Sequence, residues 1–558
     1  MTDDTGRSGD AASPKRSSRA ASLLIATGIF LSRVIGLVRA RVVVTYFGAG
    51  LQADVFSAGL RLPNVLQNLL GEGTLSASFI PVYSQLLGQG RTKEAGRVAG
   101  AMFALLLGVA GAISLLGILL APVLVTVFTP GFEGHRRELM ITVVRIIFPM
   151  TGVLVLSAWA LGILNSHRKF FIPYFAPVMW NAAIIAGIVA FNGRVSADGL
   201  LMAAAWGALA GGFLQFLVQL PWVLRLEREL RFSTGRREPM FKEVLRNAGP
   251  AIMGRGVVQL STYVDMALVS LLAVGALTRL QVAQTLYVLP ISLFAMSVAA
   301  AELPELAREA NAASTVLRQR AVEAARRVSF FVVPSLVAFI VLGQFVVAGL
   351  FRGGKFGAAD VIVVWFILAT YSLGLLASSS TRIYQSAFFA LRDTKTPARV
   401  AVLRVLVSAI CGSILMLQFE PVTIRSLTIH AGIFSDVRFA GLPLGPVGLA
   451  FGSVAGAWLE WSLLHAALKK RIGGVGAGGS HLARMFVAAI VAAIAGYGAA
   501  YAAGYQITQP ASATRHPIPM AALVLSVFGV AYFAMARAQG LSEARVVMDS
   551  VLRRLRRR

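Results

Sequence analysis

The stretch MFALLLGVAGAISLLGILLAPVLVTVF, residues Met102–Phe128, decides the fold class. It holds no charged residue over a length that exceeds the roughly 20 residues a helix needs to cross hydrocarbon. Comparable apolar blocks lie at Leu154–Leu164, Ala203–Val223, Val328–Phe351 and Met520–Ala536. Backbone polar groups in lipid must be satisfied internally, and the lack of alternation excludes a barrel. The sequence therefore predicts an all-α polytopic membrane protein.

The composition and charge agree with this class. Of 558 residues, 57% are hydrophobic and 14% are charged, which leaves too little polar surface for a soluble chain of this length. The net charge is +27, but the basic residues form short clusters between apolar blocks, which indicates membrane orientation and not a nucleic-acid partner. The basic run Val551–Arg558 predicts contact with anionic membrane lipid. Cys411 is the one cysteine, so an intrachain disulfide is excluded.

Hydropathy and turn signals predict about fourteen transmembrane helices. Their expected ranges are 22–46, 54–87, 96–128, 139–165, 173–191, 198–224, 243–273, 279–307, 328–351, 360–391, 397–418, 441–468, 482–505 and 518–537. Pro63 and Pro290 fall inside the second and eighth ranges, so we expect those helices to be kinked and these prolines to act as hinges.

The distribution of basic residues predicts that both termini are cytoplasmic. With the amino terminus inside, the inside segments hold 34 Lys and Arg residues and the outside loops hold 9. This bias follows the positive-inside rule, and a miscount of one helix would scramble it.

Short motifs recur at a nearly constant offset and predict an internal duplication. Phe128–Phe132 parallels Phe351–Phe356, Arg168–Pro173 parallels Arg392–Pro397, and Leu62-Pro63 parallels Leu289-Pro290. The alternative is chance, because Pro and Arg often mark short loops. We favour two pseudo-symmetric six-helix lobes followed by two further helices. The expected division is a disordered tail at 1–21, lobes at 22–227 and 228–472, helices 13 and 14 at 473–540, and a basic segment at 541–558.

This architecture predicts a transporter and not an enzyme. The sequence contains no Walker-type phosphate loop, its six His residues are scattered, and no His/Cys cluster suggests a metal site or cofactor. The sequence identifies no coupling ion.

Ionisable residues inside the expected spans are candidates for a functional site because they are costly in lipid. The cationic candidates are Arg33 and Arg39 in the first helix, Arg61 in the second and Arg255 in the seventh. Guanidinium groups in a wet cavity favour a polyanion such as a diphosphate. Arg33 and Arg39 are about 240° apart on an ideal helix, so sharing a cavity requires a bend, which Gly36 permits.

Other charged residues have structural interpretations. Arg255 could pair with Asp265, and Arg61 could pair with Asp54. Asp54 is also placed to cap the second helix. Further charges lie within or near the ends of spans. We expect structural or interfacial roles for Arg145, Arg382 and Glu460, and snorkelling for Arg404 and Arg484.

Several of these motifs together resemble the MurJ/MviN family of lipid II flippases, from about residue 22 to residue 470. The motifs are Leu31–Arg39, Phe47–Gly50, Ala53-Asp54, Leu62-Pro63-Asn64, Glu72-Gly73, Ser76–Pro81, Pro173–Asn181, Gly249–Ile252, Phe351–Phe356 and Asp393–Pro397. The resemblance implies the fold of the multidrug/oligosaccharidyl-lipid/polysaccharide exporter superfamily, with two lobes around a central cationic cavity. Its last two helices would line a groove for the polyprenyl tail.

The resemblance also implies a function in the bacterial inner membrane. The substrate would be undecaprenyl-diphosphate-linked peptidoglycan precursor, a lipid-linked diphosphate glycopeptide moved to the outer leaflet by alternating access, and we expect a monomer. Arg33 and Arg39 match arginines that contact the diphosphate, and Asp54, Asn64 and Glu72 match important polar positions.

The sequence departs from the family pattern at four positions, which are Ala40, Gln67, Gln284 and Thr285. Many members carry charges there, and we hypothesise that Arg41, Arg61 and Arg255 compensate. The main alternative is a flippase for another lipid-linked glycan. A polyprenyl-phosphate glycosyltransferase would need acidic residues in a large outside loop, where Gln418–Leu442 offers only Glu420 and Asp436. A non-transporting scaffold for wall assembly is a third alternative.

Overall fold

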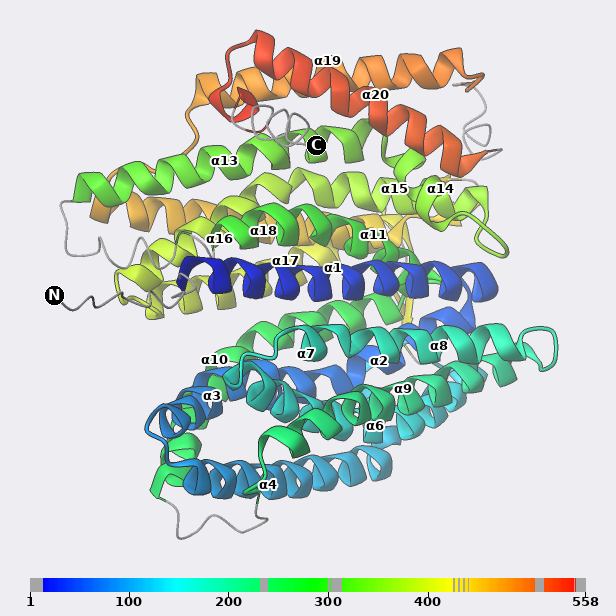
Figure 1. Ribbon diagram of the computed structural model, residues 1–558. Helices are drawn as coiled ribbons and strands as arrows, with labels where there is room; N and C mark the ends of the chain where they lie inside the picture. The colour runs from blue at the N-terminus through cyan, green and yellow to red at the C-terminus, as the bar shows by residue number, and fades with distance from the viewer. Residues whose placement is uncertain are drawn as a thin grey trace, which may run out of the picture. The chain divides into compact units, whose positions relative to one another are not determined.

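The computed structural model describes residues 14–230, 239–299, 302, 314–424, 427–429, 432–434, 437–439, 441–506, 516–545 and 547. These residues are almost entirely helical (Figure 1). The helices of the first half are α1 (Pro14–Phe47), α2 (Leu51–Leu70), α3 (Glu72–Gly88), α4 (Thr92–Leu119), α5 (Ala121–Phe128), α6 (Gly134–Ser166), α7 (Phe171–Phe175), α8 (Pro177–Phe191) and α9 (Ala197–Leu226). Those of the second half are α10 (Pro239–Ser270), α11 (Ala276–Pro290), the π-helix η1 (Ile291–Ala295), α13 (Ser314–Val341), α14 (Gly343–Phe351), α15 (Ala358–Leu373), α16 (Leu375–Ala390), α17 (Lys395–Phe419), α18 (Gly445–Ile472), α19 (Gly479–Ala502) and α20 (Pro517–Ala538).

Within the described residues, each of the fourteen expected spans overlaps one helix or consecutive helices separated by a short break; the end of the eighth, beyond residue 299, lies mostly outside them. By length and apolar composition, ten spans of the described chain can cross a membrane, and the pair α15 and α16, bent by 43°, makes eleven. The three other expected spans coincide with α1, with α2 and α3, and with α10. These three carry the cations predicted for the site. The all-α polytopic class is therefore confirmed.

Two expectations about helix boundaries need correction. The described part of the first helix begins at Pro14, well before the expected start at residue 22, and residues 1–13 of the expected tail lie outside the described residues. In the second span the helix continues through Pro63 and breaks at Gly71, where an added Cβ would clash with the carbonyl oxygen of Gln67. In the eighth span the α-helix passes directly into a π-helix after Pro290. The kinks expected at Pro63 and Pro290 stay predictions.

The helices repeat at the offset that the sequence motifs predict. This offset is the separation between Arg168 and Arg392, and it is called the repeat offset below. It defines a first repeat, α1 to α9, and a second repeat, α10 to α18. α4 and α13 both contain 28 residues and both end at a short break. α6 spans residues 134–166, and the α15–α16 pair spans 358–390, so both ends are shifted by the repeat offset. Equal lengths at equal spacing support duplication over chance.

The loops after these helices repeat in conformation as well. Arg168 and Arg392 are the non-glycine residues with positive φ in the described chain, both at 58°. Each donates its N–H to the carbonyl three residues earlier, and the next residue donates to the carbonyl five residues before itself. The two turns therefore close their helices by the same hydrogen bonds.

The second repeat differs by an insertion between α17 and α18. Residues 420–444 contain two short antiparallel hairpins, β1 (Val422–Ile424) with β2 (Leu427–Ile429), and β3 (Arg438–Phe439) with β4 (Leu442–Pro443). These strands were not predicted, because strands this short carry little sequence pattern. Most of the expected basic segment at 541–558 lies outside the described residues.

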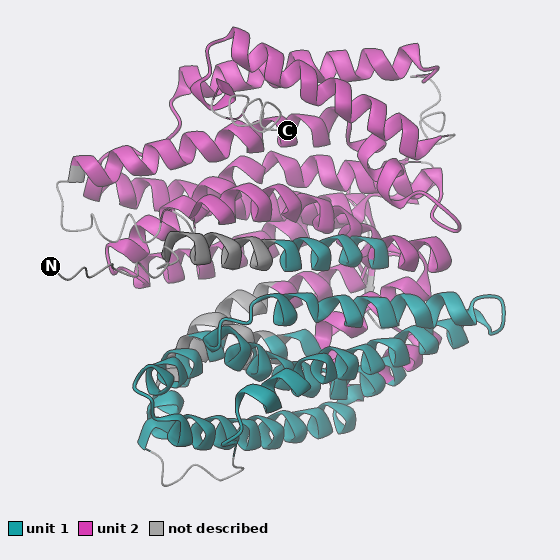
Figure 2. Ribbon diagram, viewed as in Figure 1, with its two compact units in different colours: residues 1–39, 63–121, 142–256 teal, residues 40–62, 122–141, 257–558 magenta. Residues whose placement is uncertain are grey.

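The chain forms two compact units, shown in Figure 2. The first unit contains residues 1–39, 63–121 and 142–256, and the second contains residues 40–62, 122–141 and 257–558. These boundaries pass through α1, α2, α5, α6 and α10. The predicted domain boundaries describe the repeat and stay a prediction.

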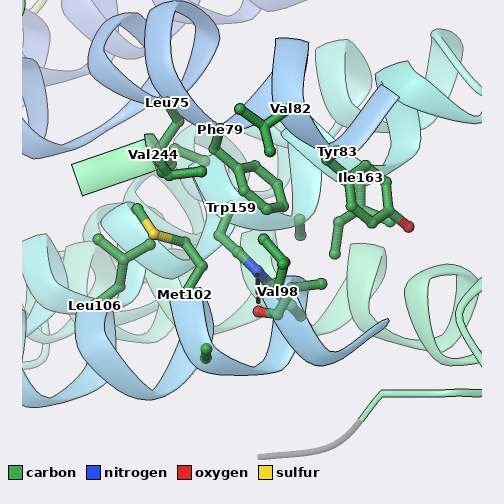
Figure 3. Close-up of a cluster of buried hydrophobic side chains, with 14 of the residues drawn as sticks. Leu75, Phe79, Val82, Tyr83, Val98, Met102, Leu106, Trp159, Ile163 and Val244 are labelled. Atoms are coloured by element: carbon green, nitrogen blue, oxygen red, sulfur yellow. Dashed lines mark hydrogen bonds between the residues drawn. The ribbon is translucent and has the colours of Figure 1, made fainter. Parts of the chain in front are cut away.

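Each unit has its own apolar core. In the first unit, Phe79, Met102 and Trp159 belong to a buried cluster built by α3, α4, α6, α9 and α10 (Figure 3). The indole N–H of Trp159 donates to the carbonyl oxygen of Ala99 at 3.0 Å, so its polar atom is satisfied. In the second unit, α19 and α20 pack on α13 and α14, where the Tyr532 hydroxyl donates to the carbonyl oxygen of Phe330.

Candidate functional site

The first unit holds the two arginines that the sequence singled out in the first helix. Arg33 is exposed on α1, and no hydrogen bond or ion pair to the described residues involves its side chain. Arg39 is half-buried, and its guanidinium carbon lies 4.7 Å from the centre of the Trp180 ring on α8. Its Nη1 atom is buried and has no hydrogen-bond partner within the described chain. A cation held this way is available for an anionic ligand.

Gly36 lies between these arginines and faces the same helix, α8. A Cβ at Gly36 would lie 4.0 Å from the Oδ1 atom of Asn181. This oxygen is buried and has no donor within the described residues, whereas the Nδ2 group of Asn181 donates to the carbonyl oxygen of Pro177. α1 runs through Gly36 without a break, so the hinge at Gly36 stays a prediction.

Asp54 lies on α2 in the second unit and is fully buried. Its Oδ2 atom accepts from Arg136 at 2.6 Å and from the backbone N–H of Gly275 at 2.7 Å. Its Oδ1 atom accepts from the backbone N–H and the hydroxyl of Thr278 at 2.9 and 2.6 Å. The carboxylate thus satisfies N–H groups at the start of α11, where helix N-termini attract negative charge.

The prediction that Asp54 caps its own helix is therefore wrong, since its side chain caps α11, which lies in the other repeat. The alternative pairing with Arg61 is also wrong, because Asp54 pairs with Arg136 from the start of α6. Sequence reasoning missed Arg136. The signal was present in the repeat offset, which relates Arg136 to Asp360, a member of the corresponding pair of the second repeat.

Each repeat joins its second and fourth spans by a salt bridge, and the two salt bridges have reversed polarity. Arg136 and Asp360 are related by the repeat offset, whereas Arg279 lies one residue beyond the equivalent of Asp54. In the first repeat, the acid is on the second span and the base on the fourth, as Asp54 and Arg136. In the second repeat, Arg279 on α11 donates from Nε to Oδ1 of Asp360 on α15 at 2.9 Å. Both pairs lie within the second unit.

Arg61 has a neutral direct partner. Its Nη2 atom donates to Oε1 of Gln284 at 2.8 Å, and Nε2 of Gln284 donates to the Tyr371 hydroxyl at 3.0 Å. Asp265 is close enough for its charge to interact with that of Arg61. The departure from the family pattern at residue 284 thus leaves Arg61 without a carboxylate at that position.

The remaining predicted site residues have separate outcomes. Asn64 is exposed on α2, in the first unit, just after Pro63. Glu72 begins α3 and Arg255 lies within α10, but the side chains of both lie outside what the structure describes. The structure brings Arg39 and Gly36 to one helix pair. It does not test the substrate role of any of these residues, so those roles stay predictions.

Two other arginines have structural partners. Arg41 donates from Nη1 to the carbonyl oxygens of Gly349 and Leu350, at 3.1 Å each, so it caps the end of α14. Whether its charge replaces the missing family charges stays a prediction. Arg404 does not snorkel, because its Nη1 atom lies 2.6 Å from Oε2 of buried Glu460. Gln385 on α16 donates from Nε2 to the Glu460 carboxylate and accepts from Arg382. These bonds agree with the structural roles expected for Arg382 and Glu460.

The fold is shared with solved structures of membrane transporters. Solved structures of multidrug transporters of the MATE family match it, with a TM-score of 0.61, 16% identity, and coverage of 81% of this chain and 98% of the other in an inward-facing example. A solved structure of "Lipid II flippase MurJ, inward closed conformation" matches with a TM-score of 0.71 and 22% identity, covering 93% of this chain and 99% of the other. The chain therefore shares the fold of these polytopic membrane proteins.

The family follows from the sequence matches. A family model described as "Lipid II flippase MurJ" matches residues 43–518, so the chain belongs to the MurJ family. "Lipid II flippase MurJ" of Burkholderia cenocepacia is 29% identical over 94% of this chain and 98% of its own length. "Probable lipid II flippase MurJ" of Bdellovibrio bacteriovorus is 30% identical over 75% of this chain and 81% of its own length. The protein is accordingly a multi-pass protein of the bacterial inner membrane.

Proposed function

We propose that this chain moves lipid II, the undecaprenyl-diphosphate-linked peptidoglycan precursor, from the inner to the outer leaflet by alternating access. Family membership supports the substrate. The observation that carries the proposal is Arg39, a guanidinium on the first expected span that stacks on Trp180 and keeps a buried Nη1 atom without a partner in the described chain. Diphosphate oxygens are well suited to pair with such a group.

Arg33 and Arg39 bind the diphosphate in this proposal. They lie less than two helical turns apart on one helix, and neither guanidinium has a carboxylate partner among the described residues. Arg61, Arg255, Asn64 and Glu72 are proposed as further contacts along the path. The hydrogen-bond partner of Arg61, Gln284, is neutral and does not offset the positive charge of the guanidinium.

The Asp54 cluster supports the conformational part of the proposal. The turn at Gly48–Gly50 and the turn before α11 are both outside in the predicted topology, with both termini cytoplasmic. Asp54 joins these turns through the N–H groups of Gly275 and Thr278. We propose that these bonds hold the outer ends of the two repeats together and release when the outer side opens. In this proposal the helices bend at Gly36, Pro63 and Pro290. Pro63 lies at a boundary between the compact units.

The electrical potential favours this direction of movement. Two negative charges that move outward from an inside-negative compartment gain about 2.3 kcal/mol per charge per 100 mV. The membrane potential can therefore contribute to transport of a diphosphate. The same polarity would oppose a cationic drug.

The test is the double variant Arg33→Ala/Arg39→Ala in cells depleted of the native protein, with measurement of which leaflet holds labelled lipid II. We expect the variant to insert normally and to leave the precursor in the inner leaflet. Arg145→Ala is the matched control, because Arg145 is an exposed arginine on α6 of the same unit, and it should flip normally.

Two outcomes would count against the proposal. Flipping by the double variant at the native rate would contradict the role of these arginines. If depletion left lipid II flipping intact while another lipid-linked glycan accumulated inside, the alternative substrate would replace lipid II.

A further inference from the structure

The inserted loop between α17 and α18 has no counterpart in the first repeat. The corresponding connection, between α8 and α9, is residues 192–196, whereas the insertion is residues 420–444. Because the first repeat connects the same two helices with a short loop, the fold does not require the added length. The insertion therefore serves some purpose beyond joining the two spans.

The insertion is fixed to the end of α17. The backbone N–H groups of Gly432 and Phe434 donate to the carbonyl oxygens of Leu417 and Gln418, at 2.8 and 3.0 Å. The ring of Phe434 stacks on Phe419, the last residue of α17, with centroids 5.4 Å apart. At the base of the loop, buried Glu420 accepts the backbone N–H of Ala273. Residues 432–434 are thus held against the last turn of α17.

The same segment exposes apolar side chains. Ile433 is 88% exposed and Phe434 is 47% exposed. Both residues come after α17, which is itself an apolar helix. Ile429, Val437 and Phe439 are also exposed. A fixed segment with apolar side chains facing outward indicates a surface that is covered by something else.

The position of Ile433 indicates what covers it. On α17, Leu406, Ile410 and Ile414 recur at helical spacing and are each more than half exposed, and only 11% of the membrane-crossing window of this helix is buried in the protein. This stripe is the lipid-facing side of the span. Because Gly432 and Phe434 bond to its last carbonyls, Ile433 lies where the span leaves the hydrocarbon.

We propose that residues 432–434 of the insertion form a membrane-interface anchor, in which Ile433 and Phe434 enter the interfacial region of the bilayer at the outer end of α17. Phospholipid is the occupant, because the exposed apolar residues adjoin a lipid-facing helix. Aromatic and aliphatic side chains at this depth fix a span relative to the bilayer. The inference concerns lipid contact alone and holds for any transported substrate.

The experiment places an environment-sensitive fluorophore on the insertion. In a Cys411→Ser background, Ile433→Cys is labelled with a nitrobenzoxadiazole dye and reconstituted in vesicles of phosphatidylethanolamine and phosphatidylglycerol. Asn192→Cys is the matched control, because Asn192 is exposed in the short loop of the first repeat. We expect quenching by lipid-borne nitroxide to be roughly twofold or more stronger at 433 than at 192, and quenching by iodide to be weaker.

Two results would overturn the anchor. Iodide quenching at 433 equal to that at 192 would place the loop in water. Protection at 433 from both quenchers would show that protein, such as a partner or a second copy, covers it. If the labelled 433 variant does not fold, Val437→Cys replaces it, and adding Phe434→Asp should lower lipid quenching at either position.

Discussion

The two repeats contain corresponding helices, but the charged side chains on these helices have different partners. On α1, Arg39 keeps a nitrogen without a partner in the described chain, whereas at the equivalent position of α10 Tyr263 donates its hydroxyl to the carbonyl oxygen of Leu62. Arg41 and Asp265 are also related by the repeat offset and have opposite charges. The first repeat thus keeps a cation where the second has a satisfied neutral group. This difference supports the proposal that the first repeat binds the anion.

The salt bridges extend the comparison. Asp54 is fully buried and accepts four hydrogen bonds, whereas Asp360 is 14% exposed and accepts one from Arg279 and one from the N–H of Gly357. The reversed polarity shows that a salt bridge can join the second and fourth spans whichever of the two spans carries the acid. The additional capping of α11 belongs to the first pair alone.

The largest expected effect comes from removing Asp54. Asp54→Ala leaves the buried guanidinium of Arg136 and the N–H groups of α11 without an acceptor, so we expect a loss of about 3–5 kcal/mol in the free energy of unfolding. Asp360→Ala should cost about 1–3 kcal/mol, because its carboxylate makes fewer bonds. Unfolding of purified protein in mixed micelles measures both values.

Reversing each pair sharpens this comparison. Arg279→Asp/Asp360→Arg should recover most of the stability lost by either single variant, since the first repeat has this polarity. Asp54→Arg/Arg136→Asp should not, because an arginine cannot accept from Gly275 and Thr278. Equal recovery in both repeats would contradict the capping role.

Gln284→Glu tests the neutral partner of Arg61. The new carboxylate would pair with the guanidinium 2.8 Å away and neutralise its charge, so we expect lipid II affinity to fall roughly tenfold, about 1.4 kcal/mol. Thr285→Glu is the control, because Thr285 is adjacent and its hydroxyl bonds to the carbonyl of Gln281 on its own helix. Titration of purified protein with lipid II measures the affinity. Unchanged affinity would remove Arg61 from the path.

Trp180→Leu tests the ring beneath Arg39. Loss of the cation–π contact should weaken lipid II binding by about 1 kcal/mol, roughly fivefold, without unfolding the first unit. Trp222→Leu makes the same change under Arg225, whose guanidinium carbon lies 5.8 Å from an exposed ring near the end of α9, and should bind normally. Equal loss in both variants would indicate a general packing effect instead.

Much of the fold could be predicted from the sequence, because hydropathy and turn residues act over short distances. Hydropathy and turn residues predicted the helical spans and the repeat offset. The turns at Arg168 and Arg392 have the same backbone conformation and are separated by this offset. The Asp54–Arg136 pair could not be read from local pattern, since its members lie on different spans far apart in the sequence. The break at Gly71 was missed because Pro63 offered a stronger local signal. The contact between Trp180 and Arg39 could not be predicted either, because it depends on how α1 packs on α8.

The smallest expected effect tests whether the two repeats are equivalent in their loops. Arg168 and Arg392 are both exposed and both hold a left-handed φ of 58°, which costs less for glycine. Arg168→Gly and Arg392→Gly should each stabilise the protein by about 0.5–1 kcal/mol, measured as a rise in the unfolding midpoint.

The neighbouring residues differ, because Lys169 follows the first turn and Asp393 follows the second. The hydrogen bonds of Asp393 with Thr396, and then its bond with Arg471, lower the pKa of Asp393 to about 2. If backbone strain sets the cost, the gains will be equal despite this difference, and adding Asp393→Asn will not change the gain at 392. A gain at 168 alone would mean that the Asp393 contacts already fix the second turn. The two turns would then have the same backbone conformation, but replacing their arginines would change stability by different amounts.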